Sequence, residues 1–130
     1  MNIITTVDQL SRLVAEIVMG ECWHEFGPMQ VGAQCSHACV KCKLRTGRIP
    51  SGKPYATDAN HALEVINWWR KSGEERGITV YHSWNNYYRV TFENGLEAAF
   101  SPSVREESFC IAICLAALRS VGYECEYKPE

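Results

Sequence analysis

The sequence predicts an α+β domain in which three helices pack on a small antiparallel β-meander. Apolar residues recur at helical spacing in three separate segments, and between the second and third of these the period changes to two. Residues 20–57 are rich in glycine, proline and cysteine and show neither period. We therefore expect the order helix, insert, helix, three strands, helix, with a short last strand where residues 123–127 alternate.

Length and composition are those of one globular domain. The chain has 130 residues, of which 46% are hydrophobic and 22% charged, so disorder and a membrane protein are both disfavoured. Its longest apolar run, residues 109–118, is too short to span a bilayer. No charged and then apolar leader follows Met1. We expect a single cytoplasmic domain over residues 1–130 that carries residues 20–57, called the insert below.

The first helix begins at a capping box made by Thr6 and Gln9 and ends at Gly20. Its predicted apolar face consists of Leu10, Leu13, Val14, Ile17 and Val18. The second helix is capped by Thr57 or Asp58. Its predicted apolar positions are Ala62, Leu63, Val65, Ile66, Trp68 and Trp69. Adjacent tryptophans cannot both face one side of a helix, so we expect one in the core and the other at its margin.

The meander begins at Ile78, and its first two strands are separated by a turn at Asn85–Asn86. The predicted inward positions are Ile78, Val80, His82 and Trp84 on the first strand, Tyr88, Val90 and Phe92 on the second, and Leu96, Ala98 and Phe100 on the third. Ser103 and Glu106 repeat the capping-box pattern ahead of the third helix, which ends at Gly122. Its predicted small-residue stripe is Phe109, Ala112, Ile113, Ala116 and Ala117.

The opposite face of the meander is a candidate binding surface. It is predicted to present Tyr81, Tyr87, Arg89, Thr91 and Glu97. Tyrosine and arginine are enriched among residues that carry most of the energy at protein interfaces. We therefore assign Tyr81, Tyr87 and Arg89 to a ligand or partner surface.

The insert carries the pattern of a zinc site. Cys39 and Cys42 are separated by two residues, the spacing with which a tight turn presents two thiolates to one tetrahedral ion. In a reducing cytosol clustered cysteines ligate metal more often than they form disulfides. Three pairs have suitable spacing to complete the site: Cys22 with His24, Cys22 with Cys35, and Cys35 with His37. A closed four-ligand zinc site is structural, since it leaves no position open for a substrate.

A basic segment follows the two firm cysteines. Residues 41–53 hold five Lys or Arg residues, Arg45 and Arg48 among them, and no acidic residue. These cations could contact phosphates, with Tyr55 nearby for stacking on bases, so a nucleic-acid-binding zinc protein is one alternative function. The net charge of -2 disfavours it, because the chain as a whole does not attract polyanions.

Catalysis has weaker support. Cys110 and Cys114 lie one helical turn apart in an apolar segment, which is typical of buried structural thiols, and Cys125 fits an inward strand position. His61 and His82 have no partner that the spacing selects. No carboxylate pair, phosphate loop or nucleophile elbow is present in the sequence. We therefore name no catalytic residue and keep a small enzyme of unknown reaction as a further alternative.

Three segments resemble the small bacteriophage proteins that carry the phage ABA-sandwich domain. They are residues 13–20, residues 56–58 at the start of the second helix, and residues 111–118 followed by Val121–Gly122. The pairing of Cys22-Trp-His24 with Cys39-Val-Lys-Cys42 is similar to that seen in such phage proteins. The resemblance implies a phage or prophage origin, a place in the host cytoplasm, and the zinc ligands Cys22, His24, Cys39 and Cys42, with Cys35 as the alternate.

Taken together, these observations predict a non-enzymatic binding module with a structural zinc site. For a phage protein the expected partner is a host protein or a small signalling nucleotide, in a counter-defence role. The residues expected to contact it are Tyr81, Tyr87, Arg89, Arg45 and Arg48.

Overall fold

A computed structural model of the chain describes residues 2–21, 23, 37–38, 45–46, 53–94 and 103–129, and for residues 37–38, 45–46 and 103–105 it describes the backbone alone. The helices are α1 (Val7–Leu13), its π-helical continuation η1 (Val14–Val18), α2 (Ala59–Lys71) and α3 (Phe109–Ser120). The strands are β1 (Asn2–Ile4), β2 (His37–Ala38), β3 (Arg45–Thr46), β4 (Arg76–His82), β5 (Tyr88–Asn94), β6 (Ser103–Glu106) and β7 (Cys125–Tyr127). The α+β class is confirmed. Among the described residues, no helix is both long and apolar enough to cross a membrane.

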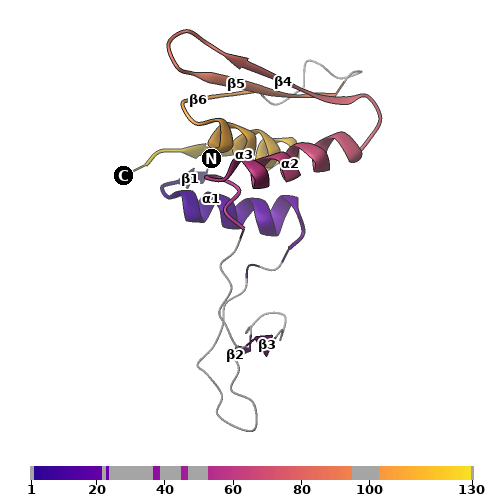
Figure 1. Cartoon of the computed structure of the whole chain (residues 1–130), viewed down its shortest axis with the longest axis vertical. Helices are drawn as coiled ribbons and strands as arrows, with labels where there is room; N and C mark the ends of the chain where they lie inside the picture. Colours follow the sequence, from indigo (N-terminus) through magenta and orange to yellow (C-terminus); the bar gives the residue numbers. More distant parts are fainter. Residues whose placement is uncertain are drawn as a thin grey trace.

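The described elements form three layers, with α3 in the middle one (Figure 1). The antiparallel sheet β4–β5–β6 lies on one side of α3, with α2 beside α3 under the same sheet. The continuous helix α1–η1 packs against the other side of α3. The hairpin of the predicted meander is therefore present, but among the described helices only α2 and α3 pack on this sheet, while the first helix packs on α3.

Helix α3 is buried almost all the way round because it lies between the sheet and α1. Its buried residues are Cys110, Ala112, Ile113, Cys114, Leu115, Ala116, Ala117 and Leu118. The buried surface of α3 is therefore wider than the predicted small-residue stripe. Small residues let neighbouring backbones approach closely on several sides, and the large residues between them fill the space that is left.

The start of α3 differs from the predicted one. Residues 103–106 are strand β6, which pairs with β5, so the capping box assigned to Ser103 and Glu106 is wrong. The N-cap is Ser108, whose Oγ accepts a hydrogen bond from the Ile111 N–H at 3.4 Å. Pairing with β5 outweighs the local capping pattern because the ladder satisfies several backbone groups at once. The expected third strand at 96–100 lies outside the described residues.

The first helix has the predicted start and end. Thr6 Oγ1 accepts the Gln9 N–H at 3.1 Å, and Gly20 ends the helix at a φ of +66°. The π-helical turn, in which the Met19 N–H bonds to the Val14 carbonyl, was not predicted. This turn holds one residue more than an α-helical turn, which shifts the later positions around the axis. Ile17 is consequently exposed, contrary to its predicted place in the core.

Helix α2 is capped by Asp58, whose carboxylate accepts the Asn60 N–H at 2.8 Å. Its core residues are Ala62, Val65 and Trp69. Trp68 is half-buried, so the expected division between the two tryptophans is confirmed. Leu63 is exposed, contrary to the prediction, because it lies on the side of α2 away from these three core positions.

The predicted last strand is present as β7, and its partner is β1 at the other end of the chain. The two strands pair in parallel, with Asn2 opposite Cys125 and Ile4 opposite Tyr127. Three residues are too few for a period to be read, and the pairing joins positions more than a hundred residues apart. The sequence pattern therefore did not reveal β1.

Helices cover the inner face of the sheet only in part. On β5 the predicted inward set is confirmed, since Val90 and Phe92 are fully buried and Tyr88 packs edge-on against Phe109. On β4 the cover ends after Ile78: Val80 and His82 are exposed. Trp84, also predicted to point inward, lies in the turn with 94% of its surface exposed. The end of the β4–β5 hairpin therefore projects beyond the helices.

Candidate functional site

The β4–β5 hairpin brings the predicted surface residues together. In its register Tyr81 lies opposite Arg89, and the Ser83 N–H donates to the Tyr87 carbonyl at 2.8 Å. Asn86 adopts a φ of +65° in the turn, a left-handed conformation that asparagine tolerates better than most residues. The predicted turn at Asn85–Asn86 is confirmed, and it sets the register that places these residues on one face.

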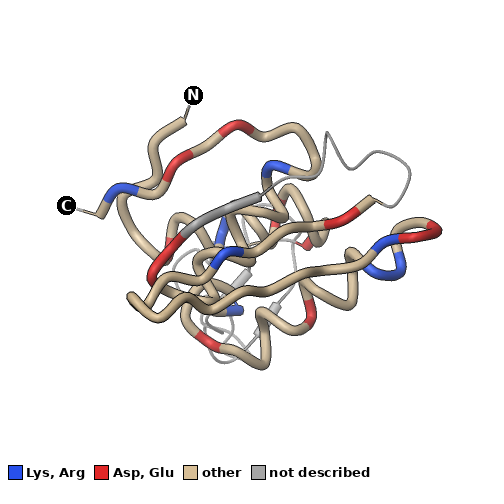
Figure 2. Tube along the Cα trace, turned by 90° about the horizontal axis from the view of Figure 1, so that it is seen from above, with Lys and Arg blue, Asp and Glu red and all other residues tan. Residues whose placement is uncertain are grey.

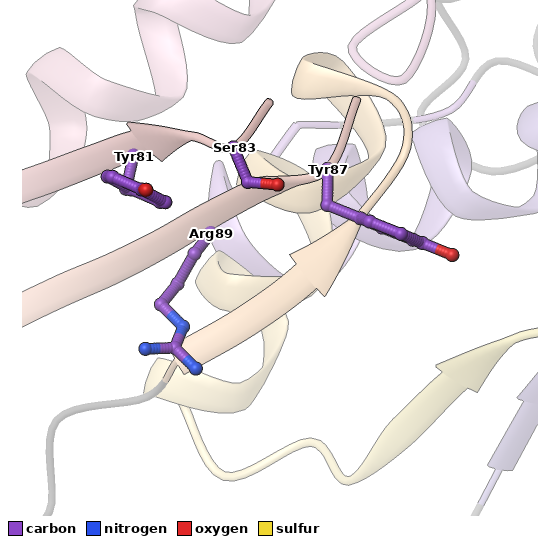
Figure 3. A pocket seen from close by; sticks show the side chains of 4 residues that line it. All are labelled: Tyr81, Ser83, Tyr87 and Arg89. Carbon is purple, nitrogen blue, oxygen red and sulfur yellow. The ribbon is translucent and has the colours of Figure 1, made fainter. Parts of the chain in front are cut away.

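This face, called the outer face below, points away from α2 and α3. The alternate residues of β5, Val90 and Phe92, are the ones packed into the core. On the outer face Tyr81, Ser83, Tyr87 and Arg89 line a pocket of about 190 Å³. In the view of Figure 3 Ser83 lies between Tyr81 and Tyr87, and the Arg89 side chain extends below Tyr81. Three of these four residues were predicted from the sequence.

Ser83 is the member of the pocket that was missed. Its hydroxyl accepts the Asn85 N–H at 3.2 Å and also bonds to the Asn85 side chain, which shapes the turn below Tyr87. Serine in a turn is too common to single out from sequence. Its place opposite Tyr87, fixed by the register, was the signal that could have identified it.

The pocket contains the positive charge of Arg89, and no described carboxylate forms an ion pair with it. Among the described residues, the ion pairs lie elsewhere and none involves Arg89. Glu93, on the same face of β5, bonds to the Thr79 hydroxyl instead. Arg105 of β6 is the register partner of Arg89, so one row of the sheet holds two arginines. Seen from above, β4 runs to the turn with no charged position after its first residue (Figure 2).

The predicted zinc ligands Cys22, His24, Cys35, Cys39 and Cys42 all lie outside the described residues. So does Arg48, and of Arg45 only the backbone in β3 is described. Strands β2 and β3 pair antiparallel, with His37 opposite Thr46 and Ala38 opposite Arg45. In the part of the chain that the structure describes, no three His, Cys, Asp or Glu residues are grouped to hold a metal. The zinc site therefore stays a prediction.

The two ends of the insert are joined by a polar cluster that the sequence did not reveal. It comprises Glu21, Lys53, Tyr55, His61 and Glu64, and is called the neck below. Lys53 Nζ lies 3.3 Å from a Glu21 carboxylate oxygen and 3.5 Å from one of Glu64. The Tyr55 hydroxyl donates to Glu21, and His61 Nδ1 lies 3.4 Å from Glu64. The sequence signal that could have predicted this cluster is the pair of opposite charges at the two ends of the insert, Glu21 and Lys53.

The neck bears on the nucleic-acid alternative. The hydrogen bond from Lys53 to Glu21, together with the negative charges of Glu21 and Glu64, raises the pKa of Lys53. The ammonium group of Lys53 is therefore already paired with carboxylates. Tyr55 is fully buried and cannot stack on a base, contrary to the expectation for that alternative. Burial and the hydrogen bond to Glu21 also raise the pKa of Tyr55. The described end of the basic segment therefore has a structural role.

Tyr55 of the neck and Cys114 of α3 should make the stability of the protein sensitive to alkaline pH. Burial raises the pKa of both Tyr55 and Cys114, whose usual values are 10.0 and 9.0, so the folded chain holds these protons more tightly than the unfolded chain. These two groups should therefore leave the free energy of unfolding unchanged below their usual pKa values and lower it as the pH rises above about 9 to 10. Tyr55→Phe should lower stability at pH 7 by about 1 to 2 kcal/mol and reduce that fall.

Urea unfolding at a series of pH values measures both effects. Tyr123→Phe is the matched control, since Tyr123 is half-buried outside the neck, and it should leave the alkaline fall unchanged. An identical alkaline fall in wild type and Tyr55→Phe would show that the buried phenol does not contribute to it.

The remaining cysteines and histidines have structural surroundings. Cys110, Cys114 and Cys125 are buried free thiols, as expected, and burial raises the pKa of each. A thiol whose pKa is raised is a poor nucleophile at neutral pH. His82 stacks on Tyr88 with ring centroids 4.2 Å apart, while His61 belongs to the neck.

No protein-family model, curated protein or solved structure matches this chain. The resemblance to phage ABA-sandwich proteins therefore stays an expectation.

Proposed function

We propose that this chain is a non-enzymatic binding module that recognises a partner protein through the outer-face pocket. The observation that carries the proposal is the grouping of Tyr81, Tyr87 and Arg89 around one cavity on an otherwise weakly charged strand pair. Tyrosine and arginine in a partly enclosed pocket are typical of interface positions that carry most of the binding energy. The expected partner is a host protein, in keeping with the phage resemblance.

The size of the pocket favours a protein over a signalling nucleotide. Pockets that enclose whole small molecules have volumes of about 300 to 1,000 Å³. A cavity of about 190 Å³ is large enough for one side chain of a partner, with the rest of the partner lying across the sheet. Because Arg89 pairs with no described carboxylate, an aspartate or glutamate of the partner fits it best.

The zinc-stapled insert is the second part of the proposal. Cys39 and Cys42 both fall in the six-residue connection between β2 and β3. A two-cysteine turn between short antiparallel strands is a common way to present two thiolates to zinc. Such a site would order the insert, and Arg45 and Arg48 would then give the insert a positively charged partner surface of its own, apart from the outer-face pocket.

Variants of the pocket test the recognition proposal. Wild-type protein is used to capture partners from lysates of candidate bacterial hosts, and the dissociation constant of each captured protein is then measured. Arg89→Ala and Tyr81→Ala should each weaken binding by at least about tenfold. Arg70→Ala, an exposed arginine on α2, is the matched control and should leave the affinity unchanged.

Two results would contradict the proposal. One is a captured partner whose affinity is the same for wild type and both pocket variants. The other is a nucleotide that raises the melting temperature of the wild type but not of Arg89→Ala. That result would assign the pocket to a small ligand.

A further inference from the structure

Strand β4 is an edge of the sheet. It pairs with β5 on one side, and among the described residues no strand lies on its other side. The hydrogen bond from the Ser83 N–H to the Tyr87 carbonyl makes that pair a hydrogen-bonded one, and such pairs alternate along an antiparallel ladder. Tyr81 and Thr79 therefore bond to β5. The backbone groups of Ile78, Val80 and His82 point away from it, toward the open edge.

Within the described part of the chain, β4 lacks the features that normally protect an edge strand. Natural edge strands are short or carry proline, lysine or a bulge, because an open row of N–H and C=O groups pairs readily with another strand. In β4 seven residues pair with β5 in continuous register, without proline or lysine, and the one charged residue, Arg76, is at its start. Val80 is 43% exposed and Tyr81 60% exposed. An unprotected apolar edge of this length is expected to be covered in the working protein.

We propose that a second copy of this chain covers the edge, with the two β4 strands antiparallel about a two-fold axis at Val80. The strand is complementary to itself in this register. Val80 then lies opposite the partner's Val80, and Ile78 opposite the partner's His82. On the outer face Thr79 lies opposite the partner's Tyr81. No like charges meet near the axis, and the exposed Val80 side chains cover one another.

The resulting assembly is a continuous six-stranded sheet with α2 and α3 of each copy on the same face. The outer-face pockets of the two copies would open on the other face, on both sides of the axis. This pairing does not depend on what the pocket binds, so it can hold or fail separately from the proposed function.

The test uses the full chain. Sedimentation equilibrium over a range of concentrations should show a monomer–dimer equilibrium. Hydrogen exchange should show that the Val80 and His82 amides become protected as the dimer forms. Val80→Lys places two like charges opposite each other and should raise the dimer dissociation constant by more than about tenfold. Val121→Lys is the matched control, because Val121 has the same 43% exposure away from β4, and it should not change that constant.

Val80→Pro is a second, backbone variant. It removes an N–H that points to the open edge and leaves the bonds of Thr79 and Tyr81 to β5 in place, so the folded chain should be monomeric. Three results would each overturn the proposal. They are a monomer at the highest soluble concentration, a dimer that neither β4 variant weakens, and protection of the Val80 and His82 amides in a monomer. The last result would mean that another part of the same chain covers the edge.

Discussion

The purified protein is expected to contain one zinc ion per chain and to lose it when Cys39 and Cys42 are both changed to serine. This is the largest effect we predict, because binding of structural zinc contributes about 10 to 16 kcal/mol in isolated zinc-finger peptides at neutral pH. Metal analysis and an X-ray absorption edge scan measure it. Cys125→Ala is the control, since Cys125 is buried in β7 and should leave the zinc content unchanged.

The effect of zinc removal should be local. The core around α3 contains its own large set of fully buried apolar side chains, and the neck joins the ends of the insert through the Glu21–Lys53 ion pair. We therefore expect a chelator to increase hydrogen exchange and proteolysis within residues 22–52 while α3 stays protected. A protein without metal, or one that contains iron, would contradict the zinc assignment.

Single variants distinguish the remaining ligands. If the set is Cys22, His24, Cys39 and Cys42, then His24→Ala should weaken zinc binding strongly and Cys35→Ser should have little effect. The reverse result would assign the fourth position to Cys35.

Trp69→Ala is expected to lower the free energy of unfolding by about 3 to 5 kcal/mol. Trp69 is 3% exposed and its ring centroid lies 5.2 Å from that of Phe92. Its indole N–H donates to the Gly77 carbonyl at 2.8 Å, and the Arg76 guanidinium lies 4.2 Å from its ring centroid. The side chain thus ties α2 to β4 by packing, a hydrogen bond and a cation–π contact together. A loss of this size is a large part of the stability of a small domain.

Trp68→Ala is the matched control for this prediction. The same atoms are removed from the neighbouring position, where the side chain is only half-buried, so the loss should be clearly smaller. Urea unfolding of both variants gives the comparison. Equal losses would show that the contacts of Trp69 add nothing beyond the removal of a large side chain.

The helices and the hairpin were predictable because each leaves a local pattern. Thr6 and Asp58 cap their helices as expected, and Gly20 ends the first helix at positive φ. The errors arose where a distant contact outweighed a local pattern. Residues 103–106 read as a helix start, but pairing with β5 makes them a strand, and β1 exists only because β7 lies beside it.

The candidate site was predictable to a similar degree. Alternation along two strands placed Tyr81, Tyr87 and Arg89 on one face, and the turn at Asn86 brought them together. The pocket itself required Ser83, whose contribution depends on its position opposite Tyr87. The neck was missed because Glu21, Lys53 and Glu64 are far apart in sequence and meet only through the packing of α2 beside the insert.

The sequence by itself determined the order of the three helices and the β4–β5 hairpin, the faces of β5, and the division between Trp68 and Trp69. Each of these depends on spacing along the chain, which backbone geometry converts directly into direction in space. Only the tertiary structure decided that α3 is the central layer, that helices cover β4 incompletely, and that no other described strand pairs with the second edge of β4, beside the pocket. These features depend on which surfaces meet, and that is set by the summed burial of apolar area over the whole chain, which no local pattern records.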